Sequence, residues 1–128
     1  MSISVCMASY NGEQYIIRQL NSILEQLTEG DEVIIVDDYS SDGTIEVLKR
    51  VDDPRIKIYI NDRNRGDVFS FNRSISLAKN EFIFLSDQDD IWIPGRVSLM
   101  QKALVDSCVN LVTTNFSWID SNDNPIDE

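Results

Sequence analysis

The sequence contains no histidine, only two cysteines, and 11 lysine and arginine residues against 22 aspartate and glutamate residues. The absence of histidine removes the commonest general base and the commonest transition-metal ligand. Proton transfer or metal binding must therefore use Asp, Glu, Tyr or backbone groups. The net charge of -11 opposes the phosphates of nucleic acid, so no nucleic acid partner is expected. It also repels a small phosphorylated ligand unless a bound cation or nearby arginines reverse the local field.

Long hydrophobic runs are also missing. No stretch approaches the roughly 20 consecutive apolar residues of a membrane span, and residues 1–5 lack the basic region of a signal peptide. These absences predict a soluble cytoplasmic protein. Cys6 and Cys108 lie in apolar segments without CxxC spacing, which predicts two buried small hydrophobic residues rather than a disulfide or a metal pair.

The residues that are present predict one α/β unit. At 128 residues and 42% hydrophobic content, the chain is long enough for the core of a single domain. Apolar runs predict strands at residues 3–8, 33–36, 56–60, 81–85 and 111–118. Helical periodicity predicts helices that begin near Glu13, at Ser41 or Asp42, and near Val68, followed by one over residues 95–108. This alternation indicates right-handed crossovers and a mainly parallel sheet with helices on both faces.

Finer patterns predict which side chains are buried. The four apolar residues at 82–85 indicate a strand that is covered on both faces. The alternation of Ile with Lys57 and Tyr59 in the strand at 56–60 places that strand near a sheet edge. The helix after residue 67 is expected to turn one apolar face toward the sheet and to stop at Asn80. That face consists of Val68, Phe71, Ile75 and Ala78.

Polar clusters follow three of the predicted strands, at residues 8–11, 37–38 and 86–90. In a parallel sheet these segments leave at the same edge, where ligands bind. Two carboxylates about 4 Å apart repel by about 4 kcal/mol at an effective dielectric constant near 20, so Asp87 and Asp89 call for a cation or a proton. Carboxylate oxygens without nearby histidine favour Mg²⁺ or Mn²⁺ over zinc.

Each cluster also has a purely structural interpretation on local sequence. Residues 86–90 alone are compatible with a solvated acidic turn, and residues 37–38 with a helix cap or loop cluster. Tyr10 and Asn11 alone are compatible with a simple turn. Arg63, Arg65 and Arg96 are candidates for contacts with phosphate oxygens, although loop arginines are commonly just solvated.

Four motifs, taken together, carry a family resemblance. "SVCMASYNGEQYI", "EVIIVDDYSSDGT", "NDRNRG" and "FIFLSDQDDIWIP" occur in the order and at the spacing of the family 2 glycosyltransferases of the GT-A fold. The chain resembles in particular the bacterial rhamnosyltransferase-like members that build surface polysaccharides. The resemblance covers nearly the whole chain and implies a GT-A, Rossmann-like sheet.

The resemblance also implies roles for individual residues. Tyr10 matches a ring near the nucleobase, Asp38 an acid that hydrogen-bonds the base, and Gly66 a glycine beside the nucleotide. Asp87 and Asp89 match the DxD motif, in which Asp89 holds the metal and Asp87 approaches the ribose and the metal shell. The nucleotide-binding set implied in this way is Ala8, Ser9, Tyr10, Asn11, Glu13, Asp38, Gly66 and Asp87.

The implied reaction is an inverting transfer of a sugar from a nucleotide-diphosphate sugar to an acceptor hydroxyl. A divalent cation, Mg²⁺ or Mn²⁺, would bridge Asp89 and the diphosphate. The implied acceptor is a saccharide or a lipid-linked saccharide, and the implied location is the cytoplasm, including the inner face of the membrane through peripheral association of the full-length protein.

The length of the chain qualifies this expectation. The family's catalytic domain ordinarily continues well past the DxD strand, so residues 1–128 are expected to be an N-terminal donor-binding part, truncated before the acceptor-binding part. The catalytic base is then expected beyond residue 128. One alternative is a nucleotide-sugar and metal-binding fragment without turnover. Another is a signalling receiver domain, which is disfavoured because the last lysine, Lys102, falls in a predicted helix rather than at a strand end.

Overall fold

The computed structural model describes residues 1–127 and divides the chain into two compact units, Met1–Pro94 and the residues from Gly95 onward. Within residues 1–127, every helix is too short or too polar to cross a lipid bilayer.

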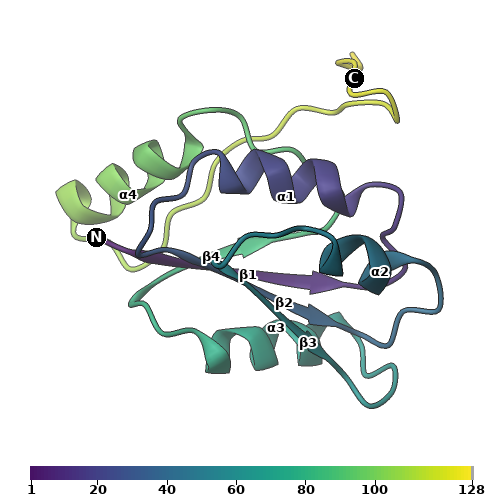
Figure 1. Ribbon diagram of the computed structural model, residues 1–128. Coiled ribbons are helices and arrows are strands. Elements are labelled where there is room, and N and C mark those ends of the chain that lie inside the picture. The colour runs from purple at the N-terminus through teal and green to yellow at the C-terminus, as the bar shows by residue number, and fades with distance from the viewer. Residues whose placement is uncertain (128) are drawn as a thin grey trace. The chain divides into compact units, whose positions relative to one another are not determined.

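A four-stranded parallel sheet forms the centre of the first unit (Figure 1). Its strands stand in the order β3-β2-β1-β4, and every neighbouring pair is parallel. Their bounds are β1 Ile3–Ser9, β2 Glu32–Asp37, β3 Ile56–Ile60 and β4 Phe82–Ser86. The predicted parallel sheet is therefore confirmed, and β3 is an edge strand, as the alternation around Lys57 indicated.

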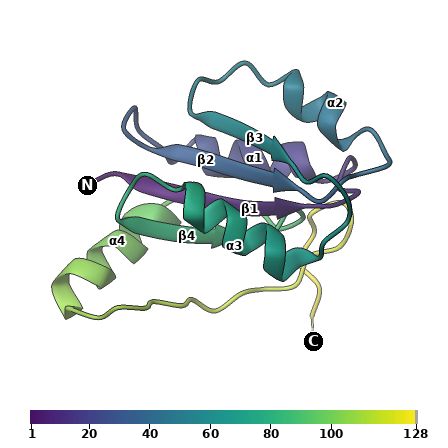
Figure 2. The ribbon, with the colours of Figure 1, turned by 90° about the horizontal axis from the view of Figure 1, so that it is seen from below.

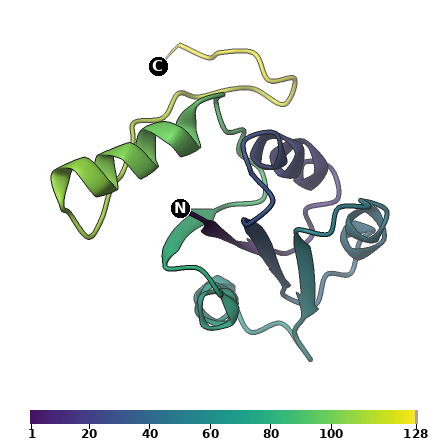
Figure 3. The ribbon, with the colours of Figure 1, turned by 60° about the vertical axis from the view of Figure 1, so that its left-hand side comes forward.

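Three helices cover this sheet: α1 Ile16–Leu24, α2 Thr44–Lys49 and α3 Asp67–Leu77. Figures 1 and 3 show α1 and α2 on one face of the sheet and α3 on the other. Figure 2, seen from the opposite face, shows α3 in front of the strands. Helices on both faces explain why β2 is buried throughout and β1 is buried except at the half-buried Ala8, since each strand has both faces covered.

The apolar face of α1 closes one side of the core. Ile16, Leu20 and Ile23 have no exposed surface, and their spacing places them on one side of the helix. Burying each of these side chains contributes about 1.5–3 kcal/mol relative to leaving it in water. The apolar periodicity that predicted a helix near Glu13 therefore corresponds to a buried face.

The predicted inward face of α3 is wrong at Val68 and Ile75, while Phe71 and Ala78 are half-buried. Ser70 and Ser74 are completely buried against the sheet, whereas Val68 is 70% and Ile75 41% exposed. Serine side chains are small enough for the helix to approach the strands closely, and the Ser74 hydroxyl donates to the Phe71 carbonyl at 2.8 Å, so its burial leaves no donor unpaired. Apolar periodicity cannot detect a helix face made of small polar residues.

Two other expectations in this region also fail. Leu85 is 56% exposed, so β4, at the edge of the four-stranded sheet, is not covered on both faces. α3 ends at Leu77, before the predicted stop at Asn80. The Asn80 side-chain amide instead donates to the Ile3 carbonyl at 2.8 Å and joins the start of β4 to the start of β1.

The second unit contains α4 Arg96–Ser107, which corresponds to the helix predicted over residues 95–108, and Val97 and Met100 are buried. The strand predicted at residues 111–118 is absent from this unit as described, where the regular pairing beyond α4 is an isolated antiparallel bridge between Ile119 and Pro125. Residues with high β propensity form a strand only when another strand supplies the ladder of hydrogen bonds.

The two cysteines differ in burial. Cys6 is buried in β1, as predicted, and burial raises the pKa of its thiol to about 11, so this thiol is unreactive near neutral pH. Cys108 is exposed at the end of α4, with a left-handed φ of 49°, so the prediction that it is buried is wrong.

Candidate functional site

The carboxyl ends of β1, β2 and β4 surround one pocket of about 440 Å³ in the first unit. Segments that are far apart in the sequence meet there because parallel strands deliver their ends to the same edge. The residues that line the pocket are Ala8, Ser9, Tyr10, Asp38, Asn64, Gly66, Asp67, Ser70, Phe71, Asp87, Gln88 and Asp89. Seven of the nine predicted site residues are in this set: Ala8, Ser9, Tyr10, Asp38, Gly66, Asp87 and Asp89.

The two acidic residues at the end of β2 have different roles: Asp37 is structural and Asp38 belongs to the pocket. Asp37 has no exposed surface and accepts hydrogen bonds from the Ser9 hydroxyl at 2.8 Å and from the Ser40 backbone N–H at 2.8 Å. These bonds tie the end of β2 to the end of β1 and to the loop that follows. Asp38, the next residue, lines the pocket.

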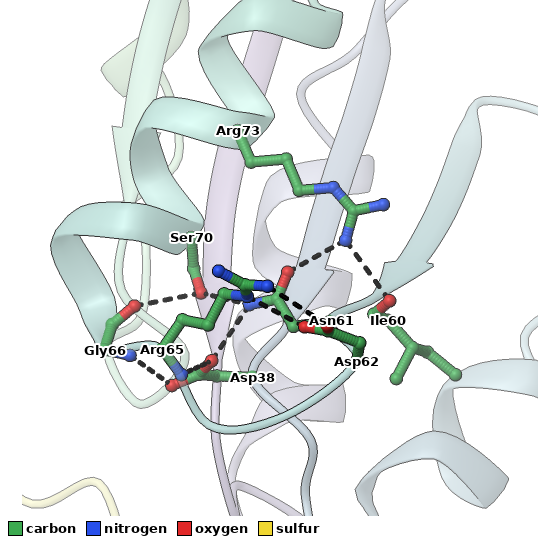
Figure 4. A network of polar contacts seen from close by, with 8 residues as sticks. All are labelled: Asp38, Ile60, Asn61, Asp62, Arg65, Gly66, Ser70 and Arg73. Atoms are coloured by element: carbon green, nitrogen blue, oxygen red, sulfur yellow. Dashed lines mark hydrogen bonds and ion pairs between the residues drawn. The ribbon is translucent and has the colours of Figure 1, made fainter.

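Three donors hold the Asp38 carboxylate in place (Figure 4). Its Oδ1 accepts from the Asn61 side-chain amide at 2.9 Å and from the Arg65 backbone N–H at 2.7 Å. Its Oδ2 accepts from the Gly66 backbone N–H at 2.8 Å. Burial by itself raises the pKa of Asp38, but these donors outweigh it and the pKa is lowered, so the carboxylate is ionised at neutral pH.

The loop after β3 is shaped around this carboxylate. Asn61 also donates to the Ser70 hydroxyl at 2.9 Å and accepts from the Arg73 guanidinium at 2.8 Å (Figure 4). Gly66 has a φ of 92°, which favours glycine, and this lets its N–H turn toward Asp38. The Arg65 guanidinium, a predicted candidate for phosphate contact, pairs instead with Asp62 at 2.8 Å. Asn61 had no distinguishing signal in the sequence.

The loop after β4 gathers negative charge. Asp87 and Asp89 are exposed at the pocket, and partial burial together with the charges of Asp90, Asp89 and Asp67 raises the pKa of Asp87. Within residues 1–127, no group of three or more Asp, Glu, His or Cys side chains is arranged to hold a metal ion without other ligands. Any cation bound here would therefore complete its coordination with ligand oxygens or water.

The middle residue of the DxD motif connects two of the strand ends. The Gln88 side-chain amide accepts from the Tyr10 backbone N–H at 2.9 Å and donates to the Tyr10 carbonyl at 2.9 Å. On the other side of the loop, the buried Gln19 of α1 donates to the Ser86 hydroxyl at 2.7 Å and to the Asp87 carbonyl at 3.2 Å. The sequence offered no signal for either glutamine, since both contacts span more than 60 residues.

Asn11 and Glu13 lie outside this pocket. The Asn11 side-chain oxygen accepts from the backbone N–H of Ser41 at 2.9 Å, and the Glu13 carboxylate accepts from the Gly43 N–H at 2.9 Å. Both residues thus hold the loop between β2 and α2, and they line a second hollow of about 470 Å³.

Comparison with known proteins identifies the family. The chain matches Glycosyl transferase family 2 over residues 4–127, nearly its whole length. The protein belongs to glycosyltransferase family 2. This confirms the resemblance that the four motifs carry and removes the receiver-domain alternative.

Curated members of family 2 are similar to the chain over most of its length. It is 30% identical over 94% of its residues to the Escherichia coli protein named UDP-Glc:alpha-D-GlcNAc-diphosphoundecaprenol beta-1,3-glucosyltransferase WfgD, and it covers 47% of that protein. It is 28% identical over 98% of its residues to the putative teichuronic acid biosynthesis glycosyltransferase TuaG of Bacillus subtilis, and it covers 51% of that protein. The chain thus spans about half the length of these relatives.

Solved structures of glycosyltransferases share the fold. The S. aureus TarS 1-349 structure in complex with UDP superimposes with a TM-score of 0.77 at 25% identity, over 91% of this chain and 39% of that one. The mannosyltransferase PcManGT from Pyrobaculum calidifontis, in complex with GDP-Man and Mn²⁺, superimposes with a TM-score of 0.76 at 26% identity, over 81% of this chain and 32% of that one. The predicted GT-A fold is confirmed.

Proposed function

We propose that residues 1–128 are the donor-binding part of a glycosyltransferase of bacterial polysaccharide synthesis. The observation that carries the proposal is the pocket at the strand ends, which joins Tyr10, Asp38, Asp87 and Asp89 in a family 2 chain. The whole protein would transfer a sugar from a nucleotide-diphosphate sugar to a hydroxyl of a saccharide or lipid-linked saccharide. The names of WfgD and TuaG support this class of substrate and pathway.

Tyr10 and Asp38 form the nucleobase end of the proposed site. The Tyr10 side chain is 47% exposed at the pocket and offers an aromatic face for stacking. The ionised Asp38 carboxylate is an acceptor for an N–H group of the base. Because three internal donors already fix this carboxylate, binding the base costs little reorganisation.

The hydrogen bonds that the Asp38 carboxylate already accepts favour uracil or thymine over guanine as the bound base. A carboxylate has about four acceptor positions, and Asn61, Arg65 and Gly66 use three, two of them on Oδ1. Guanine presents two adjacent donors, which require one open position on each oxygen. Uracil and thymine present a single imide N–H, which the remaining position on Oδ2 can accept. UDP and GDP ligands both occur among the similar structures, so the comparison does not distinguish the two bases. The number of open acceptor positions on Asp38 does.

Asp87 and Asp89 fit a divalent metal site that a ligand completes. Both are oxygen donors, and besides burial the neighbouring carboxylates raise the pKa of Asp87, so a cation bound there would offset their negative charge. The ion, Mg²⁺ or Mn²⁺, would neutralise the diphosphate and stabilise it as the leaving group. Asp89 would hold the ion and Asp87 would lie at the ribose and the metal shell, with Gln19 fixing the Asp87 backbone from below.

Transfer with inversion at the anomeric carbon is part of the proposal for the whole protein. We place the base that deprotonates the acceptor hydroxyl beyond residue 128 and assign none of the described residues to that role. The use of nucleotide sugars and a lipid-linked acceptor would place the reaction in the cytoplasm, with peripheral association of the whole protein at the inner face of the membrane.

Calorimetry on the 128-residue chain tests the proposal, with UDP and GDP titrated in the presence of Mn²⁺, Mg²⁺ or EDTA. Metal-dependent binding, tighter for UDP than for GDP, is the expected result. A parallel assay of transfer from UDP-glucose separates an active enzyme from a donor-binding module without turnover. If neither nucleotide binds in a metal-dependent way, the proposed function is wrong.

A further inference from the structure

One side chain joins the loop after β4 to the loop after β1. The Gln88 amide makes two hydrogen bonds to the same residue, accepting from the Tyr10 N–H at 2.9 Å and donating to the Tyr10 carbonyl at 2.9 Å. This paired exchange resembles the one between two opposite backbone residues of antiparallel strands. The side chain therefore extends the connection between β1 and β4 beyond the last residue pair of the sheet, Met7 with Ser86.

Gly12 provides the space for this amide. A Cβ atom at position 12 would lie 2.2 Å from Gln88 Oε1 and 2.6 Å from Gln88 Cδ, far inside van der Waals contact. Gly12 does not have a positive φ, unlike Gly66 and Gly95, so glycine is needed here for space and not for backbone conformation. Gly12 and Gln88 thus form one packing unit. We call this unit, together with the two hydrogen bonds between Gln88 and Tyr10, the Gln88 clasp.

Helix α1 holds the same loop from the other side. Besides the bonds from Gln19, the Ser22 hydroxyl accepts from the Trp92 backbone N–H at 3.0 Å. Gln19, one turn before, is fully buried, so this support is part of the core. The segment from Ser86 to Trp92 is therefore fixed to α1, and the clasp sets where the loop with Tyr10 lies relative to it.

We propose that Gln88 is a positioning residue that sets the spacing between the nucleobase end and the metal end of the site. The inference rests on the proposed function, in which Tyr10 meets the base while Asp87 and Asp89 meet the diphosphate and its ion. A nucleotide diphosphate has a fixed reach, so it binds best when the two loops are held at the matching distance before it arrives. The Gln88 amide hydrogen-bonds the Tyr10 backbone and packs against Gly12, so it acts through the loop that carries Tyr10 and through the adjacent carboxylates.

The inference makes a specific claim about binding energy. Uridine lacks the diphosphate and therefore makes no contact with Asp89 or its ion, so its affinity should depend much less on the clasp. UDP with Mn²⁺ spans both ends, so its affinity should. The gain in UDP affinity on adding Mn²⁺ is therefore the quantity that Gln88 controls, and a merely structural residue would change uridine and UDP binding alike.

Titration of Gln88→Ala with UDP and uridine, each with and without Mn²⁺, measures this quantity. We expect the Mn²⁺-dependent gain in UDP affinity to fall about tenfold, the effect of losing a pair of modest hydrogen bonds. Uridine affinity should remain within about twofold of wild type. Gln14→Ala is the matched control, because Gln14 is an exposed glutamine near the same loop that lines the second hollow rather than the pocket.

Gly12→Ala gives a second, independent way to open the clasp. The new methyl group would displace the Gln88 side chain, which is flexible, without requiring a new backbone conformation. Gly12→Ala should therefore reproduce the Gln88→Ala phenotype. The double variant should bind UDP with Mn²⁺ no more weakly than Gln88→Ala alone, since the methyl group then has no amide to displace.

Hydrogen exchange at the Tyr10 amide reports on the clasp in the ligand-free chain. Exchange should accelerate in Gln88→Ala and in Gly12→Ala but not in Gln14→Ala, because the Tyr10 N–H loses its acceptor in the first two. Two results would overturn the inference and leave the proposed function intact. The first is a Gln88→Ala variant whose UDP affinity gains as much from Mn²⁺ as that of wild type. The second is a double variant in which the losses of UDP affinity from the two substitutions add. A wild-type chain that shows no metal-dependent UDP binding would overturn both.

Discussion

Asp37 and Asp38 show how adjacent identical residues take different roles. Asp37 is buried and ties together the ends of β1 and β2, while Asp38 lines the pocket. Side chains that follow one another along an extended chain point in opposite directions, so only one of the two can face a given site. The sequence predicts an acidic cluster at this strand end, and the hydrogen-bond partners decide which member serves the ligand.

Replacing Asp38 by Asn should weaken nucleotide binding. The asparagine NH₂ group would oppose the donors of Arg65 or Gly66, and the negative charge that accepts the base N–H would be lost. We expect UDP affinity in the presence of Mn²⁺ to fall more than about tenfold and the free energy of unfolding to fall by about 1–3 kcal/mol. Calorimetry and urea denaturation measure the two effects. Asp52→Asn, the same change at an exposed position, is the control, and equal UDP affinity in both variants would contradict the assigned role of Asp38.

Asp87→Asn should separate stability from binding. Burial and the neighbouring carboxylates raise the pKa of Asp87, so its ionised form is unfavourable in the ligand-free chain. Removing this charge should leave the melting temperature in EDTA equal to or above that of wild type, while the Mn²⁺-dependent gain in UDP affinity is lost. Thermal denaturation and calorimetry on the same samples test both halves. A lower melting temperature in EDTA would show that the carboxylate is structurally required.

Helix α3 shows the limits of apolar periodicity at the scale of an element. Its position is as predicted, but its buried face consists of Ser70 and Ser74 rather than Val68 and Ile75. Ser70 also accepts from Asn61, so the same face that packs on the sheet supports the Asp38 network. Close packing and a polar network thus replaced the apolar contact that the pattern predicted.

A larger residue on that face should destabilise the fold. Ser74→Leu enlarges the side chain by two heavy atoms at a position with no exposed surface, and we expect the free energy of unfolding to fall by about 1–3 kcal/mol through overpacking. Ser76→Leu places the same side chain on the exposed face of α3 and should change stability by less than about 0.5 kcal/mol. Urea denaturation measures both variants. Equal effects at the two positions would contradict close packing of α3 on the sheet.

Glu32 is the first residue of β2, at the end of the strand away from the pocket, and it links three other segments of the chain. It is 1% exposed and accepts from the Ser4 hydroxyl at 2.6 Å, the Lys57 ammonium at 2.8 Å and the Lys79 backbone N–H at 2.8 Å. Burial raises the pKa of Glu32, but the three donors outweigh burial and the pKa is lowered. The ionised form therefore stabilises the fold above the ordinary glutamate pKa of about 4.3, and this stabilisation is lost as the pH falls through the lowered pKa.

Glu32→Gln should consequently have a pH-dependent effect. At pH 7 we expect the free energy of unfolding to fall by about 1–3 kcal/mol, because buried donors lose their charged acceptor. Below about pH 4 the difference from wild type should narrow, since the wild-type carboxyl is then protonated too. Denaturation curves across this pH range provide the measurement, with the exposed Glu29→Gln as control. A difference that stays constant with pH would show that charge is not the cause.

At the scale of the whole molecule, charge is the dominant constraint on ligand binding. The net charge of -11 repels a nucleotide diphosphate, and the arginine closest to Asp38, Arg65, has its guanidinium paired with Asp62. A bound divalent cation is thus the simplest means of making the pocket attractive to phosphate.

Salt should reveal this repulsion. With EDTA present, UDP affinity should increase as NaCl is raised from about 20 to 200 mM, because screening weakens the repulsion between UDP and the acidic chain. Uridine carries no phosphate and should bind with an affinity that does not depend on salt. Calorimetric titration of both ligands at several salt concentrations checks this prediction. A decrease in UDP affinity with salt in EDTA would mean that basic groups hold the phosphates without a metal.

The sequence by itself determined the alternation of strands and helices, the parallel sheet and the three polar clusters at its edge. These features follow from local periodicity and turn chemistry, which can be recognised within a window of about ten residues. The strand predicted at residues 111–118 failed because pairing is not a local property: within residues 1–127 this segment has no partner strand.

Only the tertiary structure decided which members of each cluster meet in the pocket. It placed Tyr10 at the pocket and Asn11 outside it, and it joined Tyr10 to Gln88 across a separation of 78 residues. The physical reason is that a buried or half-buried polar side chain takes its role from its hydrogen-bond partners, which come from other strands and loops. The local sequence specifies the side chains that are available, and the packing of distant segments selects their partners.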